Sequence, residues 1–159
     1  MIKKIITSRD FILFGIIIFG VVVVGIANPF FVQPSSLSDL LTDTSILIIL
    51  ALSQMIVILI RAIDLSVASN LALSGMLISL LSTVYPELPV IFFIILSCSI
   101  GTFLGVLNGV SIAILKVPFI VTTLGTLSIY RGLIYFVSDG KQVYSSEFSE
   151  DFLALIHYK

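Results

Sequence analysis

The sequence lacks most of the side chains that support metal or redox chemistry. Its 159 residues contain no Trp, one Cys and one His. A lone Cys98 excludes an internal disulfide framework and a cysteine-based metal cluster, and a lone His157 argues against a histidine-based metal site. The formal net charge of −1 leaves no basic patch to neutralise nucleic-acid phosphates. We therefore expect no metal, no cofactor and no nucleic-acid partner.

Catalytic motifs are also missing. The chain has no G-x-x-x-x-G-K-[ST] loop, since Gly140-Lys141-Gln142 lacks both the upstream glycine and the following hydroxyl. It has no zinc-protease motif, no dinucleotide fingerprint and no nucleophile elbow. We predict that the chain is not an enzyme, and that a partner subunit binds any ATP used in its function.

Charge is scarce, and long uncharged runs take its place. Charged residues make up 11% of the chain and hydrophobic residues 58%, whereas soluble domains carry about 25% charged residues. A membrane-spanning helix needs roughly 20 apolar residues. The pattern predicts an all-α polytopic transmembrane bundle in a lipid bilayer, with about five spans near residues 11–27, 46–60, 69–84, 90–115 and 119–137.

The second and third predicted spans cannot form one straight helix. A continuous helix over residues 46–84 would be about 58 Å long, nearly twice the hydrocarbon thickness. The chain must therefore break between Arg61 and Ser66. Either two spans meet there or one discontinuous helix bends within the membrane, and irregular backbone at that depth requires surrounding protein or a watery cavity.

Basic residues predict the orientation of the helices. If the N-terminus is cytoplasmic, alternation places five bases inside and leaves Lys141 as the one nearby base outside, as the positive-inside rule expects. The inside bases are Lys3, Lys4, Arg9, Arg61 and Lys116. We expect a cytoplasmic segment 1–10, a transmembrane region 11–143 and a polar tail 144–159. Outer loops would contain Pro29, Pro34, Asp39 and Asp43. The alternative for the start of the chain is a signal peptide cleaved near Ala27.

Small residues recur every four positions in the fourth predicted span. An extended small-xxx-small stripe lets the backbone of another helix approach closely, which favours helix packing in lipid. The stripe consists of Ser97, Gly101, Gly105, Gly109 and Ala113. It predicts a packing face and carries no information on a solute.

Asp64 is the ionisable residue at the predicted break. Such a residue near membrane depth is costly and is a functional candidate by default. The structural alternative is that Asp64 and Ser66 cap the next helix, or that Asp64 pairs with Arg61. Both interpretations remain open from the sequence.

Other polar residues lie inside the predicted spans. Asn70, Asn108, Thr122 and Thr126 either hydrogen-bond to neighbouring helices or line a polar pathway. Arg131 lies in the fifth span, where it either extends toward the outer surface or faces a cavity.

Three sequence motifs resemble the signatures of one known family. The run Ile63-Asp64-Leu65-Ser66-Val67-Ala68-Ser69 resembles IDLSVGS. Asn108-Gly109 followed by Leu115-Lys116-Val117-Pro118-Phe119-Ile120-Val121-Thr122-Thr123-Leu124-Gly125-Thr126 resembles NG…LKIPPFIVTLGT. Tyr130-Arg131-Gly132 followed by Asp139-Gly140-Lys141 resembles ARG…GGR. The similarity covers about residues 54–143. On these motifs, the chain resembles the permease subunits of bacterial ABC importers for ribose and related monosaccharides.

The resemblance implies a multi-pass permease of the bacterial inner membrane. Its partners would be cytoplasmic ATPase subunits, a second permease copy or related permease, and a periplasmic sugar-binding protein. Arg61-Ala62 in place of the usual Gly-Gly resembles the rhamnose and autoinducer-2 branch. Ala68 replaces a usual glycine, and family members are roughly twice as long, so the chain would correspond to the N-terminal half: a truncated product, a split subunit or a fragment.

We therefore expect a permease component of an ATP-driven monosaccharide importer. One alternative is an ion-coupled carrier in which Asp64 relays the ion. Another is a small structural membrane protein that assembles through the glycine stripe.

Overall fold

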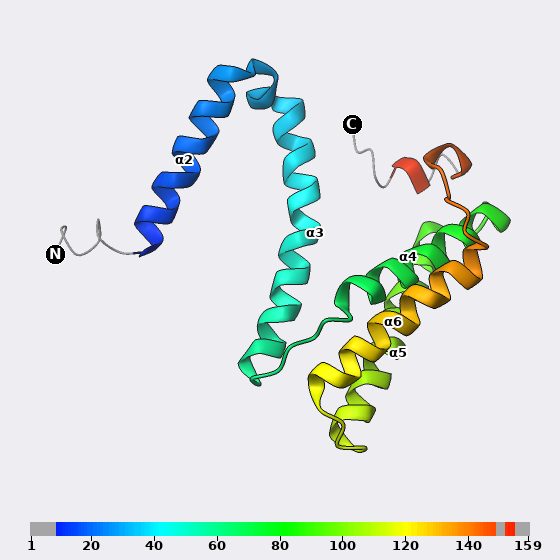
Figure 1. Ribbon diagram of the computed structural model, residues 1–159. Coiled ribbons are helices and arrows are strands. Elements are labelled where there is room, and N and C mark those ends of the chain that lie inside the picture. The colour runs from blue at the N-terminus through cyan, green and yellow to red at the C-terminus, as the bar shows by residue number, and fades with distance from the viewer. Residues whose placement is uncertain (1–8, 149–151, 155–159) are drawn as a thin grey trace. The chain divides into compact units, whose positions relative to one another are not determined.

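The computed structural model describes residues 9–148 and 152–154, and this part of the chain is helical without strands (Figure 1). The main helices are α2 (Arg9–Ala27), α3 (Pro34–Leu59), α4 (Val67–Val84), α5 (Val90–Ala113) and α6 (Phe119–Ser138). Two short 3-10 helices, η1 (Pro29–Val32) and η2 (Ser145–Glu147), accompany them. The predictions for Lys3, Lys4 and His157 lie outside the described residues.

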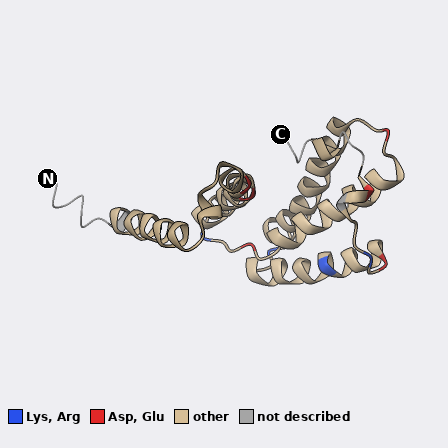
Figure 2. Cartoon of the chain, turned by 90° about the horizontal axis from the view of Figure 1, so that it is seen from above, with Lys and Arg blue, Asp and Glu red and all other residues tan. Residues whose placement is uncertain are grey.

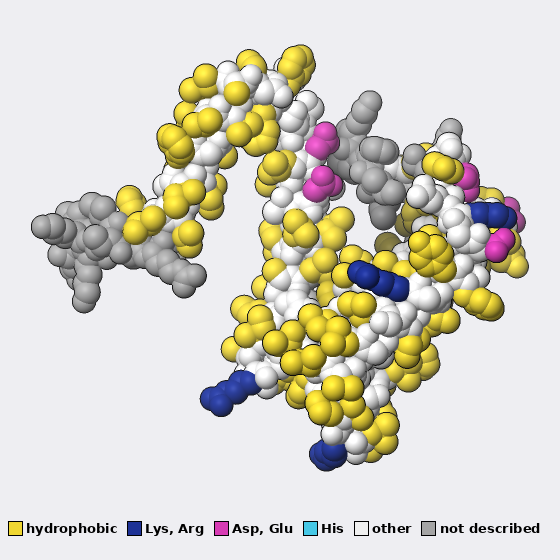
Figure 3. Space-filling model, in the orientation of Figure 1, with side chains coloured by type: hydrophobic (Ala, Val, Ile, Leu, Met, Phe, Trp, Pro, Cys, Tyr) yellow, Lys and Arg dark blue, Asp and Glu magenta, His cyan; other side chains and the backbone are white. Residues whose placement is uncertain are grey.

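The all-α, multi-helix fold class predicted from the sequence is confirmed. Among the described residues, α3, α4, α5 and α6 are long and apolar enough to cross a membrane, and Phe11–Ala27 is a shorter apolar helix. Figure 2 shows charged residues at only a few positions along the chain, and Figure 3 shows hydrophobic side chains over much of the visible surface. Such a surface suits lipid as the surrounding solvent.

The chain divides into two compact units, residues 1–52 and 53–159. In the first unit, α2 ends at a tight turn that leads into η1. Asn28 caps this turn, because its Oδ1 accepts a hydrogen bond of 3.1 Å from the Phe30 backbone N–H. Gly25 allows the return of the chain, since a Cβ at this position would lie 3.2 Å from Cγ1 of Val32.

The second span begins earlier than predicted. The sequence placed it at residues 46–60, with Pro34, Asp39 and Asp43 in the preceding loop, but α3 starts at Pro34 and contains both carboxylates. Proline is well suited to a first helical position because its missing N–H would have no partner there. Charge marks where the hydrocarbon layer ends, and a helix can continue past that boundary into the polar layer.

In the second unit, α4 packs against both α5 and α6, which also contact each other. The chain reverses between α4 and α5 and again between α5 and α6, so α4 and α6 run in the same direction (Figure 1). A small apolar core joins the three helices through Leu73, Leu104 and Tyr130. Most other buried residues of this unit are Ser, Thr or Asn. The packing surfaces are therefore mainly polar and small, whereas the exposed surfaces are apolar.

The described part of the polar tail packs on the second unit through aromatic rings. Phe148 stacks on Phe152 with ring centroids 5.0 Å apart, and Phe152 meets Phe93 of α5 edge-on at 5.7 Å. This contact gives the segment after α6 a defined place against α5.

Candidate functional site

The break between α3 and α4 begins with a tight helix end. The Arg61 N–H donates to the Ile58 carbonyl at 2.8 Å, and the Ala62 N–H donates to the Val57 carbonyl at 3.1 Å. This pair of bonds is the Schellman motif, which places a left-handed residue after the helix. Arg61 occupies that position with φ of 59°, where glycine is the usual residue.

Side chains from two other helical segments satisfy the backbone of the break. Gln54 of α3 donates from Nε2 to the Asp64 carbonyl at 2.9 Å, and Thr123 of α6 donates from Oγ1 to the Ile63 carbonyl at 3.4 Å. Ala62 is buried, and Ser66 is 1% exposed. Buried carbonyl groups outside regular structure need such partners, so the break is a built part of the fold.

A chain of hydrogen bonds connects the break to α5. Asp64 Oδ1 accepts from the Ser66 backbone N–H at 2.8 Å and from Ser66 Oγ at 2.7 Å. Asn108, which is 5% exposed, donates from Nδ2 to Ser66 Oγ at 2.7 Å. Three residues named as candidates from the sequence thus meet directly. Asp64 binds the N–H one residue before α4, and Ser66 makes no side-chain cap of its own. Among the described residues, Asp64 has no ion pair with Arg61.

The contacts also give the depth of the break. Asn108 lies five residues before the end of α5 at Ala113, which is about 8 Å along the helix. Thr123 lies four residues after the start of α6 at Phe119, or about 6 Å. Residues 63–66 therefore lie more than one helical turn inward from the ends of α5 and α6. This discontinuity is held against α5 and α6, with Ser66 buried and the Ile63 and Leu65 side chains exposed.

Two buried polar atoms near these helices retain hydrogen-bonding capacity. Asn108 Oδ1 and Thr122 Oγ1 are buried without a hydrogen-bond partner among the described residues. Buried polar atoms are nearly always paired, so each calls for a partner that the described residues do not supply. Thr126 differs, because its Oγ1 donates to carbonyl groups of its own helix, at 3.1 Å to Thr122.

Asn70 lies apart from the break and joins α4 to α5. Its Nδ2 donates to the Gly101 carbonyl at 3.2 Å, and its Oδ1 accepts from Ser74 Oγ at 3.3 Å. A Cβ at Gly101 would meet Ser74 Oγ at 3.7 Å, so the two helices approach closely there. This hydrogen bonding fits the interhelical role considered for Asn70.

The remaining members of the small-residue stripe are more open. A Cβ at Gly105 or Gly109 would have no atom within 4 Å. Ser97 is half-buried and Ala113 is exposed. Within the described chain, the stripe therefore meets α4 at Gly101 and leaves its later glycines free for other contacts.

Three side chains that hydrogen-bond between segments of the second unit were not among the residues singled out as site candidates. They are Gln54, Thr123 and Tyr130, whose phenol donates to the Leu104 carbonyl at 2.8 Å. The available signal was the polar side chain itself in an apolar span. A polar residue in an apolar span shows that its side chain will form a hydrogen bond, but the sequence does not identify the carbonyl that accepts it.

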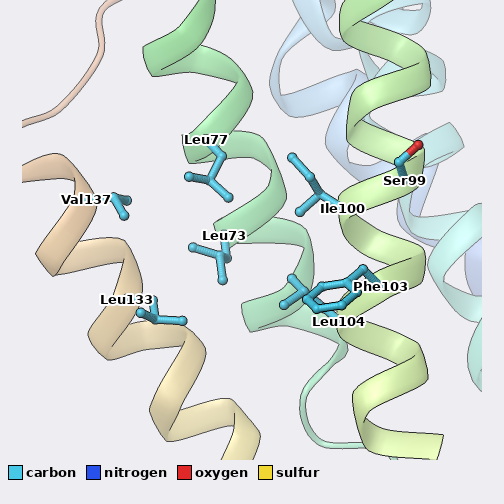
Figure 4. A pocket seen from close by; sticks show the side chains of 8 residues that line it. All are labelled: Leu73, Leu77, Ser99, Ile100, Phe103, Leu104, Leu133 and Val137. Carbon is cyan, nitrogen blue, oxygen red and sulfur yellow. The ribbon is translucent and has the colours of Figure 1, made fainter.

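An apolar groove of about 410 Å³ lies beside the core of the second unit (Figure 4). Seven of its eight lining residues are apolar, among them Leu73, Ile100, Phe103 and Leu133. The remaining one is Ser99, whose hydroxyl already donates to the Ile95 carbonyl at 2.7 Å. A polar solute would lose its hydration there without replacement, so the polar break is the better candidate for a solute path.

Comparison with known proteins gives one family. Residues 36–154 match the family described as branched-chain amino acid transport system / permease component.

The curated relatives are importer permeases. Over 141 residues, the chain is 36% identical to the ribose import permease protein RbsC of Haemophilus influenzae, covering 89% of the chain and 42% of the relative. It is 34% identical to the autoinducer 2 import system permease protein LsrC of Enterobacter sp. strain 638, covering 89% and 40%. The LsrC of Photorhabdus luminescens is 39% identical over 102 residues, covering 64% and 30%. The chain thus spans about two fifths of the length of the two relatives that it matches over 141 residues. No solved structure matches it.

Proposed function

We propose that this chain, which belongs to the permease family of branched-chain amino acid transport systems, is a membrane-spanning component of an ATP-driven importer of a monosaccharide-like solute. The relatives that cover most of it are named as import permeases for ribose and for autoinducer 2. The observation that carries the proposal is the polar discontinuity at residues 63–66, held by Asp64, Ser66 and Asn108. Transporters commonly place solute sites at such interrupted helices.

In this proposal the break is the part of the solute path that this chain contributes. Asn108 Oδ1 and Thr122 Oγ1 have no partner in the described chain and are buried, so they would hydrogen-bond the passing solute only when the helices move apart during transport. Asp64 and Ser66 would hold the backbone of the break in place. Asn70 would hold α4 against α5 beside it, whereas the Thr126 hydroxyl bonds within α6.

The chain would work with other subunits. Because it contains no nucleotide-binding motif, cytoplasmic ATPase subunits would supply the energy, a periplasmic binding protein would deliver the solute, and a second or related permease would complete the pathway. We propose a cytoplasmic N-terminus. Arg61 and Lys116 support this orientation, since they follow the ends of α3 and α5, which would lie on the same side of the membrane if the spans alternate, and basic residues are enriched on the cytoplasmic side. Cations at helix C-termini are also favoured by the helix dipole.

Two other functions predict different behaviour. An ion-coupled carrier would need Asp64 for coupling, whereas here one carboxylate oxygen already accepts two hydrogen bonds from Ser66. A structural membrane protein would use the open glycines of α5 and would transport nothing.

The test is tagged purification of the chain with the proteins encoded beside it, followed by reconstitution into liposomes. We expect an ATPase to co-purify and ribose uptake to require ATP. Asp64→Asn should retain ATP-dependent uptake, because the amide oxygen can still accept from Ser66. Uptake driven by an ion gradient and abolished by Asp64→Asn would establish the carrier, and a lone oligomer without uptake would establish the structural role.

A further inference from the structure

We propose that Arg131 and Tyr135 of α6, in a groove whose other wall is α4, form a contact site for the vicinal hydroxyl groups of the transported solute. This inference rests on the proposed function and adds the residues that would set affinity for a polyhydroxylated solute. The site is a groove of about 410 Å³, separate from the apolar groove of Figure 4.

The groove lies between α4 and α6, and each helix contributes one face. On α6 the lining residues Arg131, Ile134 and Tyr135 are spaced three and four positions apart, so they project from the same side of the helix. On α4 they are the small residues Ala68, Ser69 and Ala72. Small side chains on one wall and long ones on the other leave space that the chain itself does not fill.

The position of Arg131 calls for a polar partner. It is the thirteenth residue of α6, about 18 Å from the first residue and about 10 Å from the last. An arginine at this depth of a spanning helix is costly and usually faces the interior of a bundle or a watery cavity. Arg131 is exposed within the groove, and in the described part of the chain no carboxylate pairs with it. Its guanidinium N–H donors are therefore available in a fixed plane.

The other lining groups favour a sugar-like solute over a purely ionic one. Tyr135 is 75% exposed and offers both an aromatic face and a phenol. A monosaccharide has a C–H face that can lie on a ring and adjacent oxygen atoms that can accept from a guanidinium. Ser69 connects the groove to the break, because its Oγ donates to the Ser66 carbonyl at 2.8 Å. A solute in the groove would thus lie next to the discontinuity.

Direct binding can be measured because the chain has no Trp. Tyr135→Trp introduces a single fluorescent reporter into the groove and keeps an aromatic ring. The full chain carrying this substitution, in lipid nanodiscs, is titrated with ribose. We expect saturable quenching, a Kd at least tenfold higher when Arg131→Gln is added, and a smaller increase with Arg131→Lys. Lys141→Gln, which removes a positive charge outside the groove, should leave the Kd within twofold.

A transport assay tests the same site independently of the binding measurement. In the reconstituted importer, Arg131→Gln should raise the KM for ribose about tenfold and change kcat less than twofold, with Lys141→Gln again as the control. If the unmodified chain shows no ATP-dependent uptake, the proposed function is contradicted, whatever the result for Arg131→Gln. ATP-dependent uptake with an unchanged KM in Arg131→Gln would overturn the groove alone.

Two other occupants give distinct results. If Arg131 held a lipid phosphate, Arg131→Gln would lower the amount of co-purified anionic lipid and leave ribose binding unchanged. If Arg131 paired with a carboxylate of another subunit, Arg131→Gln would weaken assembly at unchanged ribose affinity. Either outcome overturns the proposal, and intact assembly with weakened ribose binding supports it.

Discussion

The two units of the chain are built from equally apolar helices, but only one of them packs into a bundle. In the first unit, α2 is exposed along nearly its whole described length, and residues 34–52 of α3 include no buried residue. In the second unit, α4, α5 and α6 bury Ser66, Ser69, Asn108 and Thr123 against one another. Apolar surface gains little from leaving lipid, so small and polar side chains decide which helices associate.

The largest expected effect concerns Gly101, where α5 packs against α4. Gly101→Leu should lower the free energy of unfolding by about 3 kcal/mol, because the side chain would force α5 away from Asn70 and Ser74. Gly20→Leu in α2, where no atom lies within 4 Å of a Cβ, should change it by less than about 0.5 kcal/mol. Steric-trapping unfolding in bicelles measures both. An equal loss of unfolding free energy from Gly20→Leu would show that α2 also packs against a partner.

The second effect concerns the bond that holds the break to α5. Asn108→Leu should cost about 2 kcal/mol of unfolding free energy, since it removes the donor to buried Ser66 Oγ. The matched variant is Thr44→Val in α3, whose hydroxyl donates only to the Leu40 carbonyl of its own helix. It should change stability by less than about 0.5 kcal/mol. Similar losses from the two variants would mean that interhelical bonding does not distinguish the units.

The third prediction concerns a tyrosine hydroxyl in the core of the second unit. Tyr130→Phe removes one hydroxyl that is buried against α5, where its donor bond to the Leu104 carbonyl measures 2.8 Å. The expected loss of unfolding free energy is about 1 kcal/mol. Tyr85→Phe removes an exposed hydroxyl and should be neutral in the same assay. A neutral Tyr130→Phe would assign the packing to ring contacts alone.

The smallest effect is a gain. Arg61→Gly should raise the unfolding free energy by about 0.5 kcal/mol, because glycine tolerates the φ of 59° and this relief is partly offset by its greater freedom when unfolded. Arg61→Ala removes the same charge but keeps the Cβ, so it should give no gain. A gain from Arg61→Ala would indicate that charge, and not backbone conformation, limits this helix end.

The sequence predicted the helices better than their connections. Uncharged runs located all five apolar helices, because hydrocarbon excludes charge whatever the fold. The same criterion misplaced the start of α3, since Asp39 and Asp43 can continue a helix into the polar layer. The break was expected because its two flanking helices together exceed the bilayer thickness.

The contacts within the site could not be predicted to the same extent. Asp64, Ser66 and Asn108 were named individually, but their hydrogen-bonded chain depends on the register of α5 against α4. Likewise, Thr123 reaches a carbonyl 60 residues earlier in the chain. A polar residue in an apolar run shows that a partner is needed, and only the packed structure identifies it.

The long sequence separations at the break have a consequence for biosynthesis. The carbonyl of Ile63 is synthesised 60 residues before Thr123, and Ser66 is synthesised 42 residues before Asn108. At about 5–20 residues per second, the first interval lasts roughly 3–12 s. During this time the nascent break has its local bond to Asp64 but lacks both later partners. Its hydrogen bonding is therefore completed only after the first turns of α6 have been synthesised, so the break reaches its final form late in the synthesis of this bundle.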